Sequence, residues 1–438
     1  MIGTPLLNSV DCPFSLWLGE MPQTNTVGIA AGQLKMALEM SQALKKARDN
    51  LDWLSNATIQ KILGYAQKRP LWIIGIGGSI IASMMVLDAF PHHPRREIRF
   101  IASLDGADAA EALKSVRADN PPVVVVISKS LRTLDTIVNW RYVTEVLTQR
   151  NIAFDHFVVT ADPAQAAHKG FAPDQIMIIP EALSGRYSFW SPVAIPVIAT
   201  LGADFYRQLV DGARLVDNAM HASGSNPVKQ ALEQISALDC FRIAEEDMRA
   251  WAVLPATTLL KGLPDYWQQL VMEGLGKTTD SRPTAPVVWG DIGPNAQHSF
   301  FQFIYQGTQP VISEFFVWPS ASQAQVLPNQ GMETLHAFLH YYLLKRGKAN
   351  QRHCARLFFL KEYSPKALGT LMAFMEYRTL LLAAIWGLDP FTQPGVEEGK
   401  RLAQEILASV PSGELSFCRE EDFFALFDKF NELNHEKD

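Results

Sequence analysis

A glutamine and a histidine stand side by side where a loop gives way to an amphipathic helical pattern. Residues 287–308 read VVWGDIGPNAQHSFFQFIYQGT: a strand-like apolar run, a loop rich in Gly, Pro and Asn, and then Gln297 and His298. This layout places an imidazole at the edge of a cleft. Because the ordinary pKa of histidine is about 6.5, His298 can donate or accept a proton near neutrality. The segment therefore makes His298 a candidate for acid–base chemistry, while a structural role is the more common one for a lone histidine.

A carboxylate and an amide lie four residues apart in the segment DYWQQLVMEGLGK, residues 265–277. On a helix, Gln269 and Glu273 would share one face. A carboxylate held over a substrate carbon acts as a general base and raises a rate by about 10² to 10⁴. The other interpretation is a solvated Glu273 paired with Lys277 at i+4, an arrangement worth only tenths of a kcal/mol. On the residues alone, both interpretations stay open.

Two further cations lie in short motifs rich in glycine. Arg186 occurs in SGRYS (184–188), and Lys400 closes TQPGVEEGK (392–400). A fixed cation in a site poor in water stabilises negative charge that develops on a substrate oxygen. Gln393 precedes Lys400 by seven residues, about two helical turns, so both can reach one ligand. A surface or helix-capping arginine and an exposed lysine are the ordinary alternatives.

Two loops follow strand-like runs and carry small or hydroxylated residues. The loop GIGGS (75–79) follows LWIIGI, and SKSLRTLDT (128–136) follows VVVVI. In parallel sheets, ligands bind beyond the carboxyl ends of strands, where helix N-termini attract anions. A tight turn and an ordinary Ser/Thr cap explain part of these patterns. In the first loop the glycines, among them Gly78, allow a close backbone approach, and Ser79 can donate to a phosphate oxygen. The four hydroxyls and two cations of the second loop suit a phosphomonoester.

The elements that must position these residues are short apolar strands separated by helices. Such strands occur at 71–76, 98–102, 123–127, 155–160 and 175–179, and again at 251–255, 286–290 and 310–318. Continuous apolar strands between helices indicate parallel sheets with right-handed crossovers. We therefore predict an α/β fold of two doubly wound parallel-sheet domains with a helical C-terminal region. The expected divisions are an N-terminal segment 1–32, a first domain 33–205 and a second domain 206–438.

Composition limits the function classes. The 438 residues are 48% hydrophobic and carry a net charge of −6 without a dense basic run, which disfavours a nucleic-acid partner. Four cysteines lack CxxC spacing. His336 and His340 have the i, i+4 spacing of a zinc pair, but the glutamate of HExxH is absent, so we expect no metal. No secretion signal or uninterrupted membrane span is evident, and a cytoplasmic protein without a membrane partner is predicted.

Five of these segments resemble the phosphoglucose isomerase family, whose members interconvert glucose 6-phosphate and fructose 6-phosphate. Residues 287–308 are similar to the family signature WGExGTNGQHxFxQxxHQGT, and the resemblance covers roughly residues 71–408. The other similar segments are SKSLRTLDT (family SKTxTTxET), SGRYS (GGRxS), MEGLGK (MESNGK) and TQPGVEEGK (QxGVExGK).

The resemblance implies roles for individual residues. Glu273 corresponds to the base, Arg186 to the cation that stabilises the enediolate, and His298 and Lys400 to the groups that open the sugar ring. The hydroxyl loop corresponds to the phosphate site, so the resemblance implies Ser79, Ser128, Ser130, Thr133 and Thr136 as phosphate ligands, with Lys129 contributing backbone or charge. The family further implies sugar-isomerase (SIS) domains, no cofactor, and a cytoplasmic homodimer in which the ring-opening histidine reaches the neighbouring subunit's site.

The chain also departs from the family pattern. Ser130 replaces Thr, Asp135 and Asp291 replace Glu, and Gly274-Leu275 replaces Ser-Asn; Pro294 and Ala296 replace Thr and Gly. Two alternatives follow: an isomerase of another hexose phosphate, and a non-catalytic SIS module that senses sugar phosphates. A sensor needs no base, so Glu273 is the residue that discriminates between them.

Overall fold

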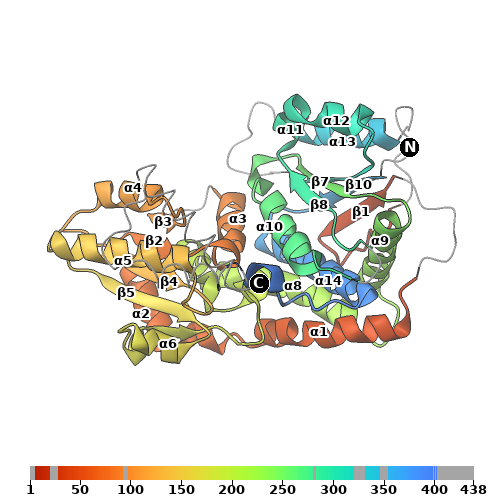
Figure 1. Cartoon of the computed structure of the whole chain (residues 1–438). Helices are drawn as coiled ribbons and strands as arrows, with labels where there is room; N and C mark the ends of the chain where they lie inside the picture. Colours follow the sequence, from red (N-terminus) through yellow and green to blue (C-terminus); the bar gives the residue numbers. More distant parts are fainter. Residues whose placement is uncertain are drawn as a thin grey trace, which may run out of the picture. The chain divides into compact units, whose positions relative to one another are not determined.

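The structure is a computed structural model that describes residues 5–19, 28–91, 97–279, 283–319, 331–345, 354–397, 399 and 401. The chain forms two compact units, Met1–Phe391 and Thr392–Asp438. Both β-sheets and the helices α1 to α14, most of them labelled in Figure 1, belong to the first unit.

The first sheet is wholly parallel and has the order β3-β2-β4-β5-β6. Its central strand reads VVVVI with every residue buried, because helices cover both faces. Val124 and Val126 pack with α4, α5 and α6, whereas Val125 belongs to the core that includes α2 and α3. The elements are β2 (Leu71–Ile74), β3 (Ile98–Ile101), β4 (Val123–Ile127), β5 (Asp155–Thr160), β6 (Ile176–Ile178), α2 (Ala57–Ala66), α3 (Ile81–Ala89), α4 (Ala107–Ser115), α5 (Leu134–Gln149) and α6 (Pro163–His168).

The second sheet has the order β1-β10-β9-β7-β8. Its strands are parallel except the edge strand β1 (Phe14–Leu18), which runs antiparallel to β10 (Cys354–Leu360). The other strands are β7 (Ala250–Pro255), β8 (Val287–Gly290) and β9 (Val311–Val317). The predicted class, two parallel sheets wound by helices, is confirmed. The strands β1 and β10 were not predicted, and β10 lies within the region expected to be mainly helical.

The long helix α14 (Pro365–Trp386) is the core helix of the unit. It has the length and apolar composition of a membrane span, but 94% of its most apolar window is buried inside the protein. It packs against α1 (Ala31–Asp49), α8 (Ala203–His221) and α9 (Pro227–Ala244). A Cβ on Gly369 would lie 1.9 Å from the carbonyl oxygen of Leu209, so glycine lets α8 and α14 approach closely.

The remaining helices connect the sheets or follow their strands. They are α7 (Ile195–Leu201), α10 (Leu263–Gln268), α11 (Gly293–Ser299), α12 (Phe301–Gln306) and α13 (Met332–Lys345). One apolar core contains residues of both sheets, such as Ile73 of β2 and Val253 of β7. The predicted boundary at residue 205 falls inside α8, and β1, from the predicted segment 1–32, belongs to the second sheet. The division into domains 33–205 and 206–438 stays a prediction.

Candidate active site

Glu273 ends a π-helical turn, Gln269–Glu273, that continues directly from α10. Turns of this wide type are rare and occur frequently at functional sites. The side chain of Glu273 is 25% exposed, and its Oε2 lies 3.2 Å from Nε of Arg186, whose side chain is only 2% exposed. The guanidinium also donates to the carbonyl oxygen of Pro390 at 2.6 Å. The partly exposed carboxylate of Glu273 thus faces the buried guanidinium of Arg186.

The simpler interpretation of Glu273 was an i+4 pair with Lys277. Across the described residues, Glu273 forms its ion pair with Arg186, 87 positions earlier, and not with Lys277. The Lys277 ammonium instead donates to the carbonyl oxygens of Gly274 (2.7 Å) and Asp389. Burial and, second, the charge of Arg186 lower the pKa of Lys277. The pairing that made Glu273 an ordinary helix residue is therefore not formed.

The glycine loop after β2 packs against the segments that carry Arg186 and Gln269. A Cβ on Gly78 would lie 2.3 Å from the carbonyl carbon of Gly185 and 2.7 Å from the amide nitrogen of Arg186. Gly77 has φ +57°, and a Cβ there would lie 3.2 Å from Nε2 of Gln269. Any larger residue at Gly78 must displace the arginine backbone. The predicted residues Gly78, Arg186, Gln269 and Glu273 thus come together.

The hydroxyl loop follows β4, next to the glycine loop that follows the neighbouring strand β2. Ser128 is buried and its Oγ accepts the N–H of Leu131 at 3.2 Å, while the exposed Ser130 accepts the N–H of Arg132 at 3.3 Å. Leu131 has φ +51°, an unusual conformation for a residue with a side chain. The Lys129 ammonium donates to the Glu181 carbonyl at 2.8 Å, and burial lowers its pKa.

Three hydroxyls of the predicted phosphate site carry few bonds of their own. Thr133 is the N-cap residue of α5, and its side chain makes no capping hydrogen bond. Oγ1 of Thr136 is buried and has no hydrogen-bond partner among the residues that the structure describes. Ser79 is half-buried in the turn Gly77–Ser79 that leads to α3. The loops at the ends of β2 and β4 therefore hold the predicted hydroxyls at the start of helices, where an anion is stabilised.

His298 is exposed on α11, after β8. No hydrogen bond or ion pair in the described part of the chain joins it to Glu273 or Arg186. Its neighbour Gln297 is hydrogen-bonded through Oε1 to Nε2 of His336 at 2.7 Å. The structure therefore does not bring the predicted histidine to the Arg186–Glu273 pair within a single chain.

A chain of side chains that the sequence analysis did not connect supports α11. His336 contacts His340 with 3.0 Å between their Nε2 atoms, and His340 contacts the hydroxyl of Tyr305 on α12. Burial, then the neighbouring His336, lowers the pKa of His340 to about 4. The i, i+4 spacing had suggested a zinc pair; among the described residues no group of three His, Cys, Asp or Glu side chains is arranged to hold a metal.

Gln393 and Lys400 belong to the second compact unit. Gln393 precedes a helical stretch, Pro394–Glu397, and its Nε2 donates to Oε1 of Glu397 at 3.3 Å. Lys400 lies outside the described residues. The predicted joint action of these two residues on one ligand stays a prediction.

The fold and the site are typical of an enzyme that moves protons on an anionic substrate. The carboxylate–guanidinium pair suits the proton transfer, and the hydroxyl loops beyond the strand ends suit the anion. A family model described as phosphoglucose isomerase matches residues 37–357 and 349–417. The chain belongs to the phosphoglucose isomerase family.

Individual relatives support this assignment. The chain is 30% identical over 401 residues to a glucose-6-phosphate isomerase of Acinetobacter venetianus, covering 81% of this chain and 70% of the relative. It is 28% identical over 438 residues to a glucose-6-phosphate isomerase of Shewanella denitrificans, covering 90% and 79%.

Solved structures agree. The crystal structure of a glucose-6-phosphate isomerase from Chlamydia trachomatis superposes with a TM-score of 0.70 at 25% identity, covering 94% of this chain and 79% of that one. A hypothetical protein from Thermus thermophilus has a TM-score of 0.68 at 21% identity over 86% and 97% of the two chains, which supports the fold alone.

Proposed function

We propose that the protein interconverts glucose 6-phosphate and fructose 6-phosphate through a cis-enediol intermediate. The observation that carries the proposal is the pair formed by Arg186 and the half-open Glu273, at 3.2 Å, in a chain of the phosphoglucose isomerase family. A sensor of sugar phosphates has no need of a base paired with a buried cation. The pair thus disfavours the sensor, and the relatives named glucose-6-phosphate isomerase disfavour an isomerase of another hexose phosphate.

Glu273 is the proposed proton carrier. In the open-chain aldose, its carboxylate removes the proton from C2, the electrons form the C1=C2 bond, and O1 takes up a proton. When O2 of the enediol loses its proton, Glu273 returns its own proton to C1 and the ketose forms. Because Arg186 contacts Glu273, a carbon held over the carboxylate has its oxygens beside the guanidinium, which stabilises them as they become negative.

The substrate phosphate is assigned to the loops after β2 and β4. Serine and threonine hydroxyls, backbone amides at helix N-termini and the nearby Lys129 suit a dianion. The proposed ligands are Ser79, Ser128, Ser130, Thr133 and Thr136. Gln269 borders this region through its contact with Gly77. No cofactor or metal takes part in the proposed steps.

Ring opening is assigned to His298 and Lys400, with Gln393 as a further substrate contact, in a homodimer whose two sites are shared. This proposal is supported by the exposure of His298 on α11 and by the apolar surface of the adjoining helix α13. Contiguous exposed apolar side chains are typical of protein interfaces. Those on α13 are Met332, Leu335, Leu339, Tyr342 and Leu343. A second copy on this face brings His298 toward the partner's substrate.

We further propose that the protein acts in the cytoplasm on a small hexose phosphate, without a nucleic-acid or membrane partner. The phosphoglucose isomerase family supports the hexose phosphate, and the net charge of −6 without a dense basic run in the sequence disfavours a nucleic-acid partner.

The test is isotope exchange with a matched variant. Incubation of the protein with fructose 6-phosphate in heavy water places deuterium at C2 of the glucose 6-phosphate formed. Glu273→Gln retains the KM of the wild type within a few-fold and loses at least about 10²-fold in kcat, because only the proton carrier is removed. Glu145→Gln, an exposed glutamate of α5 bonded to Gln149, is the control and keeps full turnover. Exchange at an unchanged rate in Glu273→Gln contradicts the assignment of the base.

A further inference from the structure

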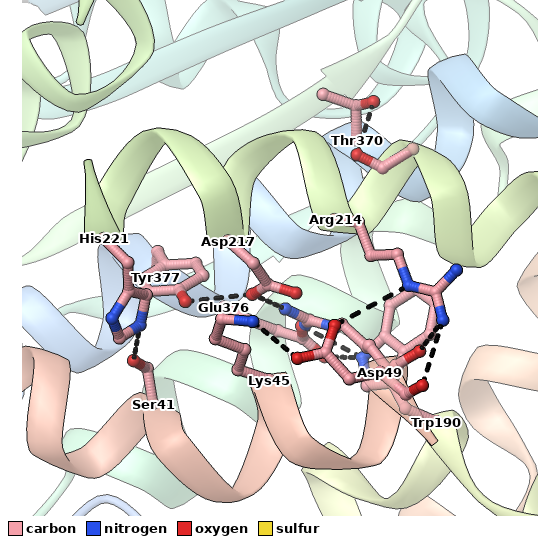
Figure 2. Close-up of polar contacts among 12 residues, drawn as sticks. Ser41, Lys45, Asp49, Trp190, Arg214, Asp217, His221, Thr370, Glu376 and Tyr377 are labelled. Atoms are coloured by element: carbon pink, nitrogen blue, oxygen red, sulfur yellow. Dashed lines mark hydrogen bonds and ion pairs between the residues drawn. The ribbon is translucent and has the colours of Figure 1, made fainter. Parts of the chain in front are cut away.

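Glu376 is a carboxylate buried in the middle of α14 with 0% exposure. Its Oε1 accepts the indole N–H of Trp190 at 2.8 Å and the hydroxyl of Tyr266 at 3.2 Å. Its Oε2 contacts the guanidinium of Arg48 from α1. All three are donors, which suits the acceptor oxygens of a carboxyl group. Figure 2 shows Glu376 and Trp190 in this network.

Two of the three donors lie on the segments that carry the Arg186–Glu273 pair. Trp190 ends the 3₁₀ segment Gly185–Trp190, which contains Arg186. Tyr266 belongs to α10, which runs without a break into the turn that ends at Glu273. These donors are 186 and 110 positions from Glu376 along the chain. One buried carboxylate thus connects both partners of the pair to the core helix.

We propose that Glu376 is a positioning residue for the isomerase reaction, holding the backbone segments of Arg186 and Glu273 at the separation that proton transfer requires. This inference rests on the proposed function. Glu376 touches no reacting group, since its side chain is enclosed by Arg48, Trp190 and Tyr266. It acts through the two segments, and a displacement of about 1 Å between catalytic groups can cost up to about 10²-fold in rate.

Asp217 belongs to the same network and serves as a matched control for Glu376. Arg48 also binds Asp217 of α8, with NH1 to Oδ1 at 2.6 Å, and Asp217 is equally buried. The hydroxyl of Tyr377 donates to the same Oδ1 at 2.9 Å. Figure 2 places Asp217 and Tyr377 on the far side of the network from Trp190. Neither residue is hydrogen-bonded to the segments of Arg186 or Glu273 in the described part of the chain.

Two pairs of matched variants test the inference. Glu376→Gln and Asp217→Asn each replace a carboxyl group that contacts Arg48 by an amide. Tyr266→Phe and Tyr377→Phe each remove one buried hydroxyl. We expect similar losses in Tm within each pair. Glu376→Gln lowers kcat about tenfold or more and Tyr266→Phe lowers it several-fold, with KM changed less than about twofold, whereas Asp217→Asn and Tyr377→Phe keep the wild-type kcat.

The outcomes are separable. If the wild-type protein shows no isotope exchange or turnover, the proposed function fails. If the wild type is active and each Glu376-side variant matches its Asp217-side control in kcat, the positioning role of Glu376 is overturned. Should both carboxylate variants fail to fold, the two Tyr→Phe variants decide the question, because they remove a single oxygen atom and no charge.

Discussion

At the residue scale, the decisive fact about Glu273 is its partner. The sequence offered Lys277, four residues away, and the folded chain supplies Arg186, which is 87 residues away. Spacing along a helix detects neighbours on that helix, but it does not detect groups that the fold brings together from other segments. The residue types could therefore be chosen from the sequence through the family resemblance, whereas the pairing could not.

Position 78 requires glycine for a reason that the sequence pattern indicates only in part. The loop GIGGS suggested a close backbone approach to a phosphate. The structure shows that Gly78 also lies against the peptide of Gly185 and Arg186, and the approach to a phosphate stays a prediction. The absence of a side chain thus sets the distance between the glycine loop and the arginine segment.

We predict that Gly78→Ala destabilises the protein and lowers kcat. A Cβ at 2.3 Å from the carbonyl carbon of Gly185 must move the backbone, and overpacking of this kind costs roughly 1–3 kcal/mol. Gly64→Ala is the control, since nothing lies within 4 Å of a Cβ added at this position of α2, and it gains about 0.4–1 kcal/mol. Urea unfolding and steady-state kinetics measure both. Equal stability and activity of the two variants would refute this explanation.

At the element scale, local pattern located the buried strands and missed two others. The run VVVVI is apolar on both faces and was predicted with the limits of β4, and the other predicted strands were located to within two residues at each end. The strand β10 reads CARLFFL and contains Arg356, whose charge is buried with 0% exposure. That charge is compensated by Glu314 of β9 and Asp239 of α9, at 2.9 and 2.5 Å. Compensation by distant carboxylates is invisible in a local window, so the strand was not recognised.

The buried His340 of α13 makes the stability of the protein depend on pH. Burial lowers the pKa of His340 to about 4, whereas a histidine in the unfolded chain has a pKa of about 6.5. Between these values the unfolded chain binds more protons than the folded chain, so stability is lost as the pH falls from about 6.5 toward 4. For this one side chain, the loss in the free energy of unfolding is roughly 1–3 kcal/mol.

Urea unfolding at pH 7.5 and pH 5.0 measures this effect. The loss of stability between the two pH values is smaller in His340→Asn than in the wild type. His168→Asn, a change at an exposed histidine of α6, leaves the loss unchanged. An identical pH dependence in His340→Asn and the wild type would assign the acid sensitivity to other groups.

At the scale of the whole molecule, the question is whether His298 acts in the partner's site. Mixing two inactive variants answers it. If the sites are shared, a hybrid dimer of His298→Ala and Glu273→Gln subunits has one site with both changes and one site with neither. Equal mixing then restores about one quarter of the wild-type activity, because half of the dimers are hybrids and half of their sites are intact.

If each site lies within a single chain, every site in the mixture carries one change and activity stays at the level of the separate variants. A control for assembly itself is Leu339→Glu on α13, which is expected to give monomers in sedimentation experiments, compared with Val10→Glu at a lone exposed position. A dimeric Leu339→Glu protein would move the interface away from α13.

The edge strand β1 has a consequence for the order of events during biosynthesis. Residues 14–18 pair with residues 354–360, which are translated more than 300 residues later. At about 5–20 residues per second, β1 waits about 20–70 s before its pairing strand exists. The second sheet is therefore completed only after residues 354–360 have been synthesised, and until then β1 lacks the strand it pairs with.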